Sequence, residues 1–312
     1  MPRHVYLQPD APDPVLAEGR VLALVRPYLP TARRVRAVEE SGGEARAYLV
    51  DDDAVLKVQR PQQLRPLTSL AKEAFILERL AALPEGERLV APRVLGHGRA
   101  DPGIEYTLLS RVPGSALGRV DLGPDLRRRV LAELGRSLRR LHALPVDPFV
   151  ASGLVPGDLS FWDTMTRIAE PLLDRAGEVR DRGQPWDFPL SIERIAGRAL
   201  SSLVPAQERA VLHSNPYEEH VFVDPARGVF AGVIDFGDAY VSHPALDLRR
   251  WNRPPDRDAL LAGYEEAGAV GDAWMGVWRA LMIVADVNTM VQAPQRADEA
   301  RRDLAALLAE IG

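Results

Sequence analysis

Residues that bind cations and orient hydroxyl groups gather in one stretch of the chain, residues 211–238. His213, Asn215 and His220 lie in its first half, and Asp235 lies near its end, directly after an apolar run and before Phe-Gly. Imidazole nitrogens and carboxylate oxygens bind divalent cations, and an amide can hydrogen-bond a hydroxyl group. The pattern predicts a loop followed by a hairpin, with the Asp235 carboxylate presented at the end of a strand.

Lysine is nearly absent from this arginine-rich chain, in which Lys57 and Lys72 are the only two lysines. An ammonium is a compact point charge, whereas the guanidinium of arginine is a broad planar fork. A retained lysine therefore hints at a site that needs a point charge. Lys57 lies in a predicted strand and Glu73 lies on the helix that follows, which allows the two side chains to pair.

The elements that must position these residues begin with a small antiparallel sheet. Its strand patterns are separated by turn signals such as Ser41-Gly42-Gly43. The predicted strands cover residues 34–39, 45–50, 54–59, 90–95 and 104–111, and the predicted helices of this part cover residues 14–28 and 67–83. We therefore expect a five-stranded N-terminal lobe with Lys57 in its third strand.

The remainder of the chain is mainly helical. Helical periodicity covers residues 126–141, 162–178, 256–267, 272–291 and 296–311. Residues 145–190 are rich in Pro, Gly and Asp, and Pro113-Gly114 is the best candidate boundary. The fold class is therefore α+β with two lobes, residues 1–112 and residues 113–312.

Composition narrows the class of protein. The chain has 312 residues, no cysteine and a net charge of -5. Without cysteine there is no disulfide, which favours a cytoplasmic protein, and the negative charge gives no reason to expect nucleic acid as a partner. No apolar run is long enough to span a membrane. We expect no membrane partner, and a monomer or a homodimer.

The polar residues together meet the needs of phosphoryl transfer from a nucleotide. That reaction requires a cation on the phosphates, an acidic residue that holds this cation, ligands for magnesium and a group that orients the attacking hydroxyl. Lys57 paired with Glu73 is the candidate for the first two, and Asp235 is the candidate metal ligand. Ser41-Gly42-Gly43 is the candidate for a flexible cover over the phosphates.

At this point the chain resembles the aminoglycoside phosphotransferase family, small-molecule kinases with a protein-kinase-like fold. The resemblance covers roughly residues 34–251. In that family the catalytic loop reads His-Gly-Asp, four residues and Asn; here it reads His213-Ser214-Asn215, four residues and His220. The family's metal motif is matched by Asp235-Phe236-Gly237, and its later Asp-Pro…Asp-Leu signature by Ser242-His243-Pro244…Asp247-Leu248. Residues 106–114 resemble the hinge between the lobes.

The resemblance implies a two-lobed protein-kinase-like fold, with an N-terminal nucleotide-binding lobe, and ATP or GTP with Mg²⁺ as cofactors. It implies transfer to a hydroxyl group of a small molecule, an antibiotic such as an aminoglycoside or a macrolide. Asn215 and His213 would then lie in the catalytic loop, and Asp235 and His220 would bind the metal. The backbone of Ser110 and Val112 would bind the nucleobase. The acceptor would bind residues 150–190 and the last three helices.

Asn215 departs from the family pattern at the catalytic aspartate. Its carbonyl oxygen can still orient a hydroxyl group, but an amide cannot act as a base near neutral pH. Because general-base catalysis typically contributes about 10²–10⁴-fold, a large loss of rate is expected, but not necessarily a loss of binding. Two origins are open: a deliberate substitution that traps substrates, or the natural state of a pseudokinase. We favour the first because Lys57, Glu73 and Asp235 are all intact.

His220 stands where the family has a magnesium-binding asparagine. Imidazole binds metals, although magnesium prefers oxygen ligands. Histidine at this position is similar to the macrolide phosphotransferase branch, which weighs against an aminoglycoside acceptor more than against kinase chemistry.

Two alternatives from other classes stay open. The first is a catalytically inactive pseudokinase that binds Mg-nucleotide without transfer. The second is a hydrolase or oxygenase in which His213, His220 and Asp235 form a two-histidine, one-carboxylate metal site. The second alternative gives Lys57 and Glu73 no role.

Overall fold

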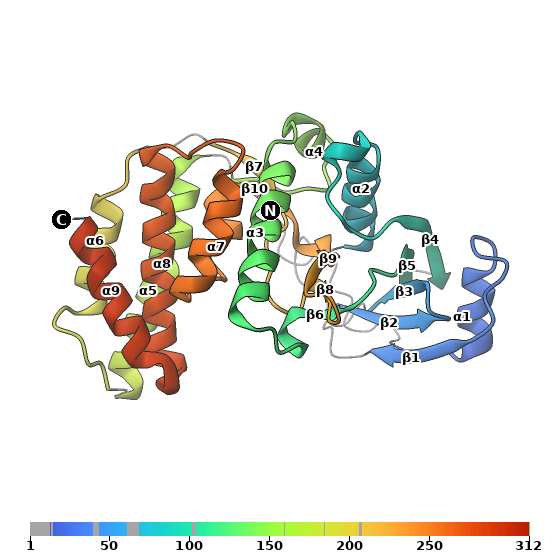
Figure 1. Ribbon diagram of the computed structural model, residues 1–312, viewed down its shortest axis with the longest axis horizontal. Helices are drawn as coiled ribbons and strands as arrows, with labels where there is room; N and C mark the ends of the chain where they lie inside the picture. The colour runs from blue at the N-terminus through green and yellow to red at the C-terminus, as the bar shows by residue number, and fades with distance from the viewer. Residues whose placement is uncertain are drawn as a thin grey trace. The chain divides into compact units, whose positions relative to one another are not determined.

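The computed structural model describes residues 13, 15–39, 44–60, 69–101, 104–158, 160–183, 185–205 and 208–311 (Figure 1). Two compact units divide the chain. The first contains Met1–Leu122, Asp147–Pro156 and His213–Tyr240, and the second contains Gly123–Val146, Gly157–Leu212 and Val241–Gly312. The units are therefore interleaved along the sequence. The boundary predicted between residues 112 and 113 stays a prediction about the lobes.

The first unit is built on a five-stranded antiparallel sheet, as predicted. Its strand order is β1-β2-β3-β5-β4. The strands are β1 (Val35–Glu39), β2 (Ala45–Val50), β3 (Ala54–Gln59), β4 (Val94–Asp101) and β5 (Ile104–Ser110). The predicted fold class, α+β with an antiparallel N-terminal sheet, is confirmed.

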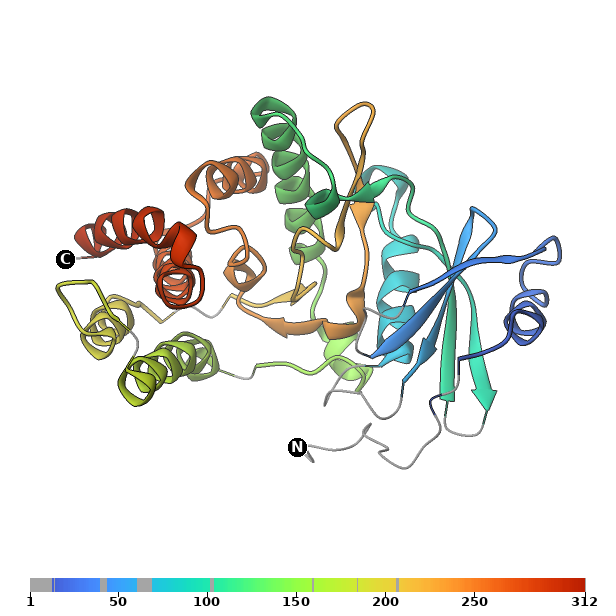
Figure 2. The same ribbon diagram turned by 90° about the horizontal axis from the view of Figure 1, so that it is seen from below.

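The two faces of this sheet contact different parts of the unit. Successive side chains of a strand point to opposite faces. Leu56 and Val58 of β3 face a buried core with α1 (Glu18–Val25). Lys57, between them, pairs in register with Ala47 and Thr107 on the neighbouring strands. Figure 2 shows α1 on one face of the sheet and α2 (Leu70–Ala81) on the other. The alternation of β3 thus presents Lys57 on the face that α2 covers.

The fourth strand differs from its prediction. We expected residues 90–95, but β4 begins at Val94 and ends at Asp101. Pro92 lacks the backbone N–H that a strand ladder needs, which delays the start. Gly96 and Gly98 obscure the strand pattern, yet Gly96 is required, because a Cβ there would lie 2.3 Å from the ring of Tyr28. Tertiary packing explains what local propensity did not predict.

The predicted loop and hairpin are present in the first unit. β8 (Val221–Asp224) pairs antiparallel with β9 (Val229–Val233), and β6 (Ser115–Ala116) joins β8 on its other side. The 3-10 turn η4 (Phe236–Asp238) follows β9. The short helix α4 (Asp147–Ala151) also belongs to this unit, and its Phe149 meets Phe75 of α2 edge-on. The sequence did not predict α4.

The second unit is mainly helical. Its helices are α3 (Pro124–His142), α5 (Phe161–Arg182), α6 (Ile192–Ser201), α7 (Pro254–Glu265), α8 (Asp272–Gln292) and α9 (Ala297–Glu310) (Figure 1). α6 was missed because it lies beyond a stretch rich in Pro and Gly. Helices α3 and α7 pack at glycines: a Cβ on Gly263 would lie 1.9 Å from the carbonyl oxygen of Ala132. Among the described residues, no helix is long and apolar enough to cross a bilayer.

The chain also contains two further short strands and several 3-10 turns. β7 (Ala210–Leu212) pairs with β10 (Tyr240–Ser242), where the chain leaves the first unit. The 3-10 turns are η2 (Glu85–Glu87), η3 (Leu117–Arg119), η5 (Pro244–Asp247) and η6 (Pro294–Arg296). In η5, Asp247 is fully buried and its Oδ2 lies 3.0 Å from Nε2 of His142 on α3. The later signature motif therefore contributes a buried polar contact to the second unit.

A buried carboxyl group in the second unit makes stability depend on pH. Asp286 of α8 accepts a hydrogen bond from Asn252 and neighbours Asp303 of α9, which is paired with Arg257 of α7. Burial raises the pKa of Asp286 to about 9, and the Asp303 carboxylate adds to this rise. The folded state therefore favours the neutral acid, so the stability that this group contributes is full below its ordinary pKa and is lost as pH rises toward about 9.

We expect Asp286→Asn to remove this part of the pH dependence, because an amide keeps a donor for Asp303 and an acceptor for Asn252 but does not ionise. Since one unit of pKa corresponds to about 1.4 kcal/mol, the unaltered chain should lose on the order of 2–4 kcal/mol more than the variant between about pH 5 and about pH 8. Urea unfolding of both forms at the two pH values measures this. Equal losses would contradict the assignment.

Candidate functional site

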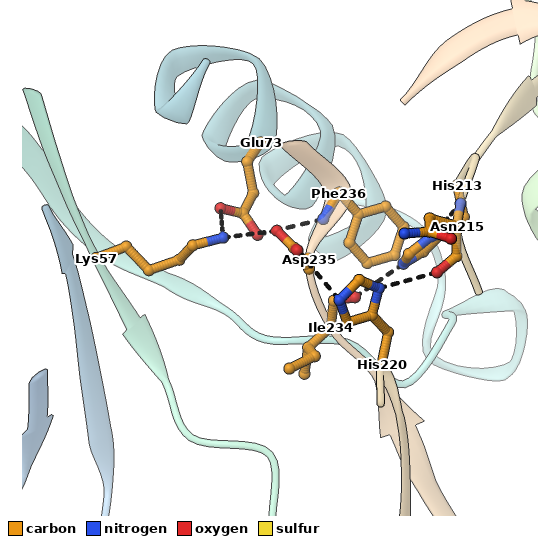
Figure 3. A network of polar contacts seen from close by, with 8 residues as sticks. All are labelled: Lys57, Glu73, His213, Asn215, His220, Ile234, Asp235 and Phe236. Carbon is orange, nitrogen blue, oxygen red and sulfur yellow. Dashed lines mark hydrogen bonds and ion pairs between the residues drawn. The ribbon is translucent and has the colours of Figure 1, made fainter. Parts of the chain in front are cut away.

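Three residues predicted from separate parts of the chain come together in the first unit. Lys57 Nζ of β3 lies 2.7 Å from Glu73 Oε2 of α2 and 2.8 Å from Asp235 Oδ1, just after β9 (Figure 3). Glu73 is fully buried, whereas 41% of the Asp235 side chain is exposed. One ammonium thus joins a buried carboxylate to an accessible one.

The charges in this trio stabilise one another. Burial opposes the charge of Lys57, but the carboxylates of Asp235 and Glu73 outweigh it and raise the pKa of Lys57. Burial also opposes the charge of Asp235, yet the Lys57 ammonium and the His220 ring hold its pKa below the usual range. For Glu73, burial and the nearby Asp235 carboxylate raise the pKa, against the pull of Lys57. The cation and the accessible carboxylate are therefore both charged at neutral pH.

The backbone at Asp235 adopts a conformation that side chains rarely take. Its φ is 71° and its ψ is 69°, in the left-handed region. Such conformations persist where the surroundings hold them, and they cluster at functional sites. Here Glu73 Oε1 accepts a hydrogen bond from Phe236 N at 3.2 Å, and the His220 carbonyl accepts one from Ile234 N at 3.0 Å. Backbone hydrogen bonds on both sides of Asp235 therefore orient its carboxylate.

His213 serves the structure of the loop. It is fully buried, its Nε2 donates to the Ile234 carbonyl at 2.9 Å, and its Nδ1 accepts from Asn215 N at 3.3 Å. Its ring also packs against Phe236 at a centroid distance of 4.5 Å. Both ring nitrogens are thus engaged with backbone, and His213 joins the loop that contains Asn215 to the segment that carries Asp235.

His220 turns its Nε2 toward the Asp235 carboxylate. Its Nδ1 lies 2.9 Å from the Asn215 carbonyl oxygen, and its Nε2 lies 3.3 Å from Asp235 Oδ2 (Figure 3). A carbonyl oxygen only accepts, so Nδ1 must carry the proton of a neutral ring. Nε2 and the carboxylate oxygen are then two acceptors side by side, an arrangement that a shared cation or a second ring proton stabilises.

These two donors fit a divalent cation. An imidazole nitrogen beside a carboxylate oxygen is a donor pair that suits Mn²⁺ and also binds Mg²⁺ through the oxygen. Within the described part of the chain, no group of three or more His, Cys, Asp or Glu side chains could hold a metal. A cation at this pair would need further ligands besides these two side chains.

The side-chain oxygen of Asn215 accepts no hydrogen bond within the described part of the protein. Its Oδ1 is buried and has no hydrogen bond partner in the structure, while its backbone carbonyl accepts from both His220 and Tyr217. Buried polar atoms are nearly always hydrogen-bonded, so an exception calls for a specific explanation. A hydroxyl group of a bound molecule is a donor of the kind that this oxygen lacks.

A pocket of about 760 Å³ lies beside the trio, within the first unit. Lys57, Glu73, His220 and Asp235 line it together with apolar side chains of the sheet, namely Ala45, Ala47, Val55 and Leu109. This volume lies in the range of ligand pockets. Among the polar lining residues that sequence reasoning missed are Arg119 and Tyr217, and Tyr217 lies inside the stretch 211–238 that it had singled out.

The residues of the predicted nucleobase contacts line the same pocket. Ser110 and Val112 both line it. The N–H of Ser110 donates to the Arg93 carbonyl at 2.8 Å, so a nucleobase contact by Ser110 would have to use its carbonyl oxygen. The predicted phosphate cover, Ser41, Gly42 and Gly43, lies outside the described residues. The nucleobase contacts and the cover stay predictions.

The predicted acceptor region belongs largely to the second unit. Trp162 of α5 is 73% exposed, and the indole N–H of Trp186 donates to the Leu190 carbonyl at 2.8 Å. The other tryptophans, Trp251, Trp274 and Trp278, are buried in the core. An acceptor pocket built from residues 150–190 stays a prediction.

Comparisons with known proteins identify the family of the chain. The model of the phosphotransferase enzyme family (APH) matches residues 34–282. The structure of the GDP and kanamycin complex of APH(2")-IIia is similar, with 20% identity, 93% of this chain and 97% of that chain covered, and a TM-score of 0.60. So is apo macrolide 2'-phosphotransferase MphH from Brachybacterium faecium, with 18% identity, 93% and 97% covered, and a TM-score of 0.58.

A macrolide 2'-phosphotransferase of type I is similar as well, with 20% identity, 96% of this chain and 99% of that chain covered, and a TM-score of 0.59. At these identities the solved structures bear on the fold alone, a two-lobed protein-kinase-like fold. The family match spans most of the chain and includes the trio and residues 211–248. The chain therefore belongs to the phosphotransferase enzyme family.

Proposed function

We propose that this protein binds ATP or GTP with a divalent cation and serves transfer of the γ-phosphoryl group to a hydroxyl group of a small-molecule antibiotic. The observation that carries the proposal is the Lys57–Glu73–Asp235 trio at the wall of a pocket large enough for a nucleotide. Family membership supports the phosphotransferase activity. The kanamycin and macrolide named for two similar structures support an antibiotic acceptor.

In the proposed complex, each residue has a distinct task. Lys57 holds phosphate oxygens, and the buried Glu73 keeps Lys57 at the pocket wall and in its charged form. Asp235 and His220 would hold the cation, which supplies charge neutralisation on the phosphates. The carbonyls of the hinge and the apolar face of β2, β3 and β5 would bind the base. Binding of phosphates would draw the Lys57 ammonium from Asp235 toward the ligand, which frees that carboxylate.

Asn215 would contact the acceptor hydroxyl group through its side-chain oxygen. Its buried Oδ1 has no internal partner and can therefore accept from that hydroxyl. As an amide it cannot take the proton, so this chain orients the acceptor without general-base catalysis. The same observation favours a second candidate, a pseudokinase that binds Mg-nucleotide without turnover. A two-histidine metal site would instead require His213 to break its contacts with Ile234 and Asn215.

The first expected outcome concerns Asn215→Asp, which restores a base at this position. We expect the variant to consume nucleotide about 10²–10⁴-fold faster than the unaltered chain when the acceptor is present. Consumption of ATP and of GTP is measured against a panel of aminoglycosides and macrolides, with Asn215→Ala as the control. Tight Mg-nucleotide binding by both forms without acceptor-dependent turnover would support the pseudokinase instead.

The second expected outcome concerns Glu73→Gln. The amide has one acceptor oxygen for two donors, Lys57 Nζ and Phe236 N, so one of these contacts is lost. We expect Mg-ATP affinity to fall about 10–100-fold in isothermal titration. Glu78→Gln on the exposed part of the same helix is the matched control and should bind as the unaltered chain does. Equal affinity of both variants would remove Glu73 from the site.

The third expected outcome concerns the cation. Because an imidazole ligand suits Mn²⁺ better than Mg²⁺, we expect His220→Asn to lower the ratio of Mn²⁺ affinity to Mg²⁺ affinity about 10-fold. Titration of each cation into the protein with a non-hydrolysable ATP analogue measures the ratio. Removal of the cation with EDTA should weaken analogue binding in both forms. An unchanged ratio would mean that His220 is no ligand.

A further inference from the structure

The second of the two lysines has no part in the proposed reaction. Lys72 precedes Glu73 on α2, and only 1% of its surface is exposed. Burial of an ammonium is costly unless polar groups compensate it. One such group is the backbone carbonyl of Ala239, whose oxygen accepts a hydrogen bond from Lys72 Nζ at 3.0 Å.

Lys72 and Glu73 hold the two ends of one short segment. Glu73 accepts from Phe236 N at the start of η4, and Lys72 donates to the Ala239 carbonyl at its end. Between them the turn is closed by a hydrogen bond from Ala239 N to the Phe236 carbonyl at 3.1 Å. Two consecutive residues of one helix thus fasten both ends of the turn that follows Asp235.

This clamp, formed by Lys72 and Glu73, is itself anchored. The backbone N–H of Lys72 donates to Ser69 Oγ at 3.0 Å, which begins α2. The left-handed backbone at Asp235 directly precedes the clamped turn. A conformation of this kind persists only while neighbouring contacts hold it. Release of the far end of the turn should therefore loosen the orientation of the Asp235 carboxylate.

We propose that Lys72 is a positioning residue, whose buried ammonium fixes the end of the turn after Asp235 and so keeps the Asp235 carboxylate turned toward Lys57 and His220. The structural part of this inference stands on the contacts of Lys72 and Ala239. Its consequence for cation binding rests on the proposed function. The sparse use of lysine in the chain agrees with the inference, because an ammonium is a more compact charge than a guanidinium.

The test variant is Lys72→Met, which keeps the length of the side chain and removes the ammonium. Amide hydrogen exchange, measured without nucleotide or metal, should become faster over residues 235–240, where the Ala239 amide reports on the turn. Leu80→Val, at a buried position two turns along the same helix, is the control for general loosening of α2. It should leave exchange over residues 235–240 unaltered.

The second readout is Mn²⁺ affinity, followed by electron paramagnetic resonance in the presence of a non-hydrolysable ATP analogue. Loss of a residue that orients a metal ligand typically weakens metal binding about 10–100-fold, and we expect Lys72→Met to fall in this range. Affinity for the analogue in EDTA should be the same as in the unaltered chain. A merely destabilising substitution would weaken both.

The outcomes separate the two proposals. Faster exchange over residues 235–240 with weaker Mn²⁺ binding in Lys72→Met alone supports the clamp. The clamp is overturned if hydrogen exchange over residues 235–240 in Lys72→Met equals that in the unaltered chain or in the Leu80→Val control. If no form binds Mn²⁺ with the analogue, the proposed function fails, and the exchange data still decide the clamp. If Lys72→Met does not fold, Lys72→Gln replaces it, with the same expected direction.

Discussion

The functional part of this molecule depends on the burial of one ammonium between two carboxylates. Lys57 can stay charged inside the protein only because Glu73 and Asp235 lie within hydrogen-bonding distance of it. A buried charge without a partner costs several kcal/mol, so the strand, the helix and the segment after β9 must keep their relative places. Three features keep Lys57, Glu73 and Asp235 together: the alternation of side chains along β3, the N-cap of α2 and the hairpin of β8 and β9.

The same constraint explains the unusual backbone that follows. A residue with a side chain costs roughly 1–2 kcal/mol in the left-handed region. Asp235 adopts it because its carboxylate must meet Lys57 and His220 while the chain turns back toward α2. His213, Glu73 and Lys72 each bond the backbone on one side of it. The backbone at Asp235 is strained, and these contacts hold its carboxylate in a fixed direction.

The second unit also depends on polar groups that are buried in pairs. Its helices bury polar groups that pair across the bundle, such as His142 with Asp247, and Arg257 with Asp303. Partnered polar groups in a core oppose alternative packings because any slip leaves them unsatisfied. Close glycine contacts between α3 and α7 add a steric constraint. Within this unit, burial raises the pKa of the Asp286 carboxyl group to about 9.

Local sequence patterns were enough to predict the family, the five-stranded sheet of the first unit and the residues of the trio. These signals are alternation in β3, turn residues, and short motifs in a fixed order. The bounds of the fourth strand were predicted wrongly and the helix α6 was not predicted, because their glycines and flanking prolines carry no local preference for these elements. Other features became evident in the folded chain alone: His213 bonds backbone, His220 turns Nε2 to Asp235, and Lys72 reaches Ala239. These outcomes depend on contacts between residues far apart in the chain, and which nitrogen or oxygen faces a partner is set by packing, which no local pattern encodes.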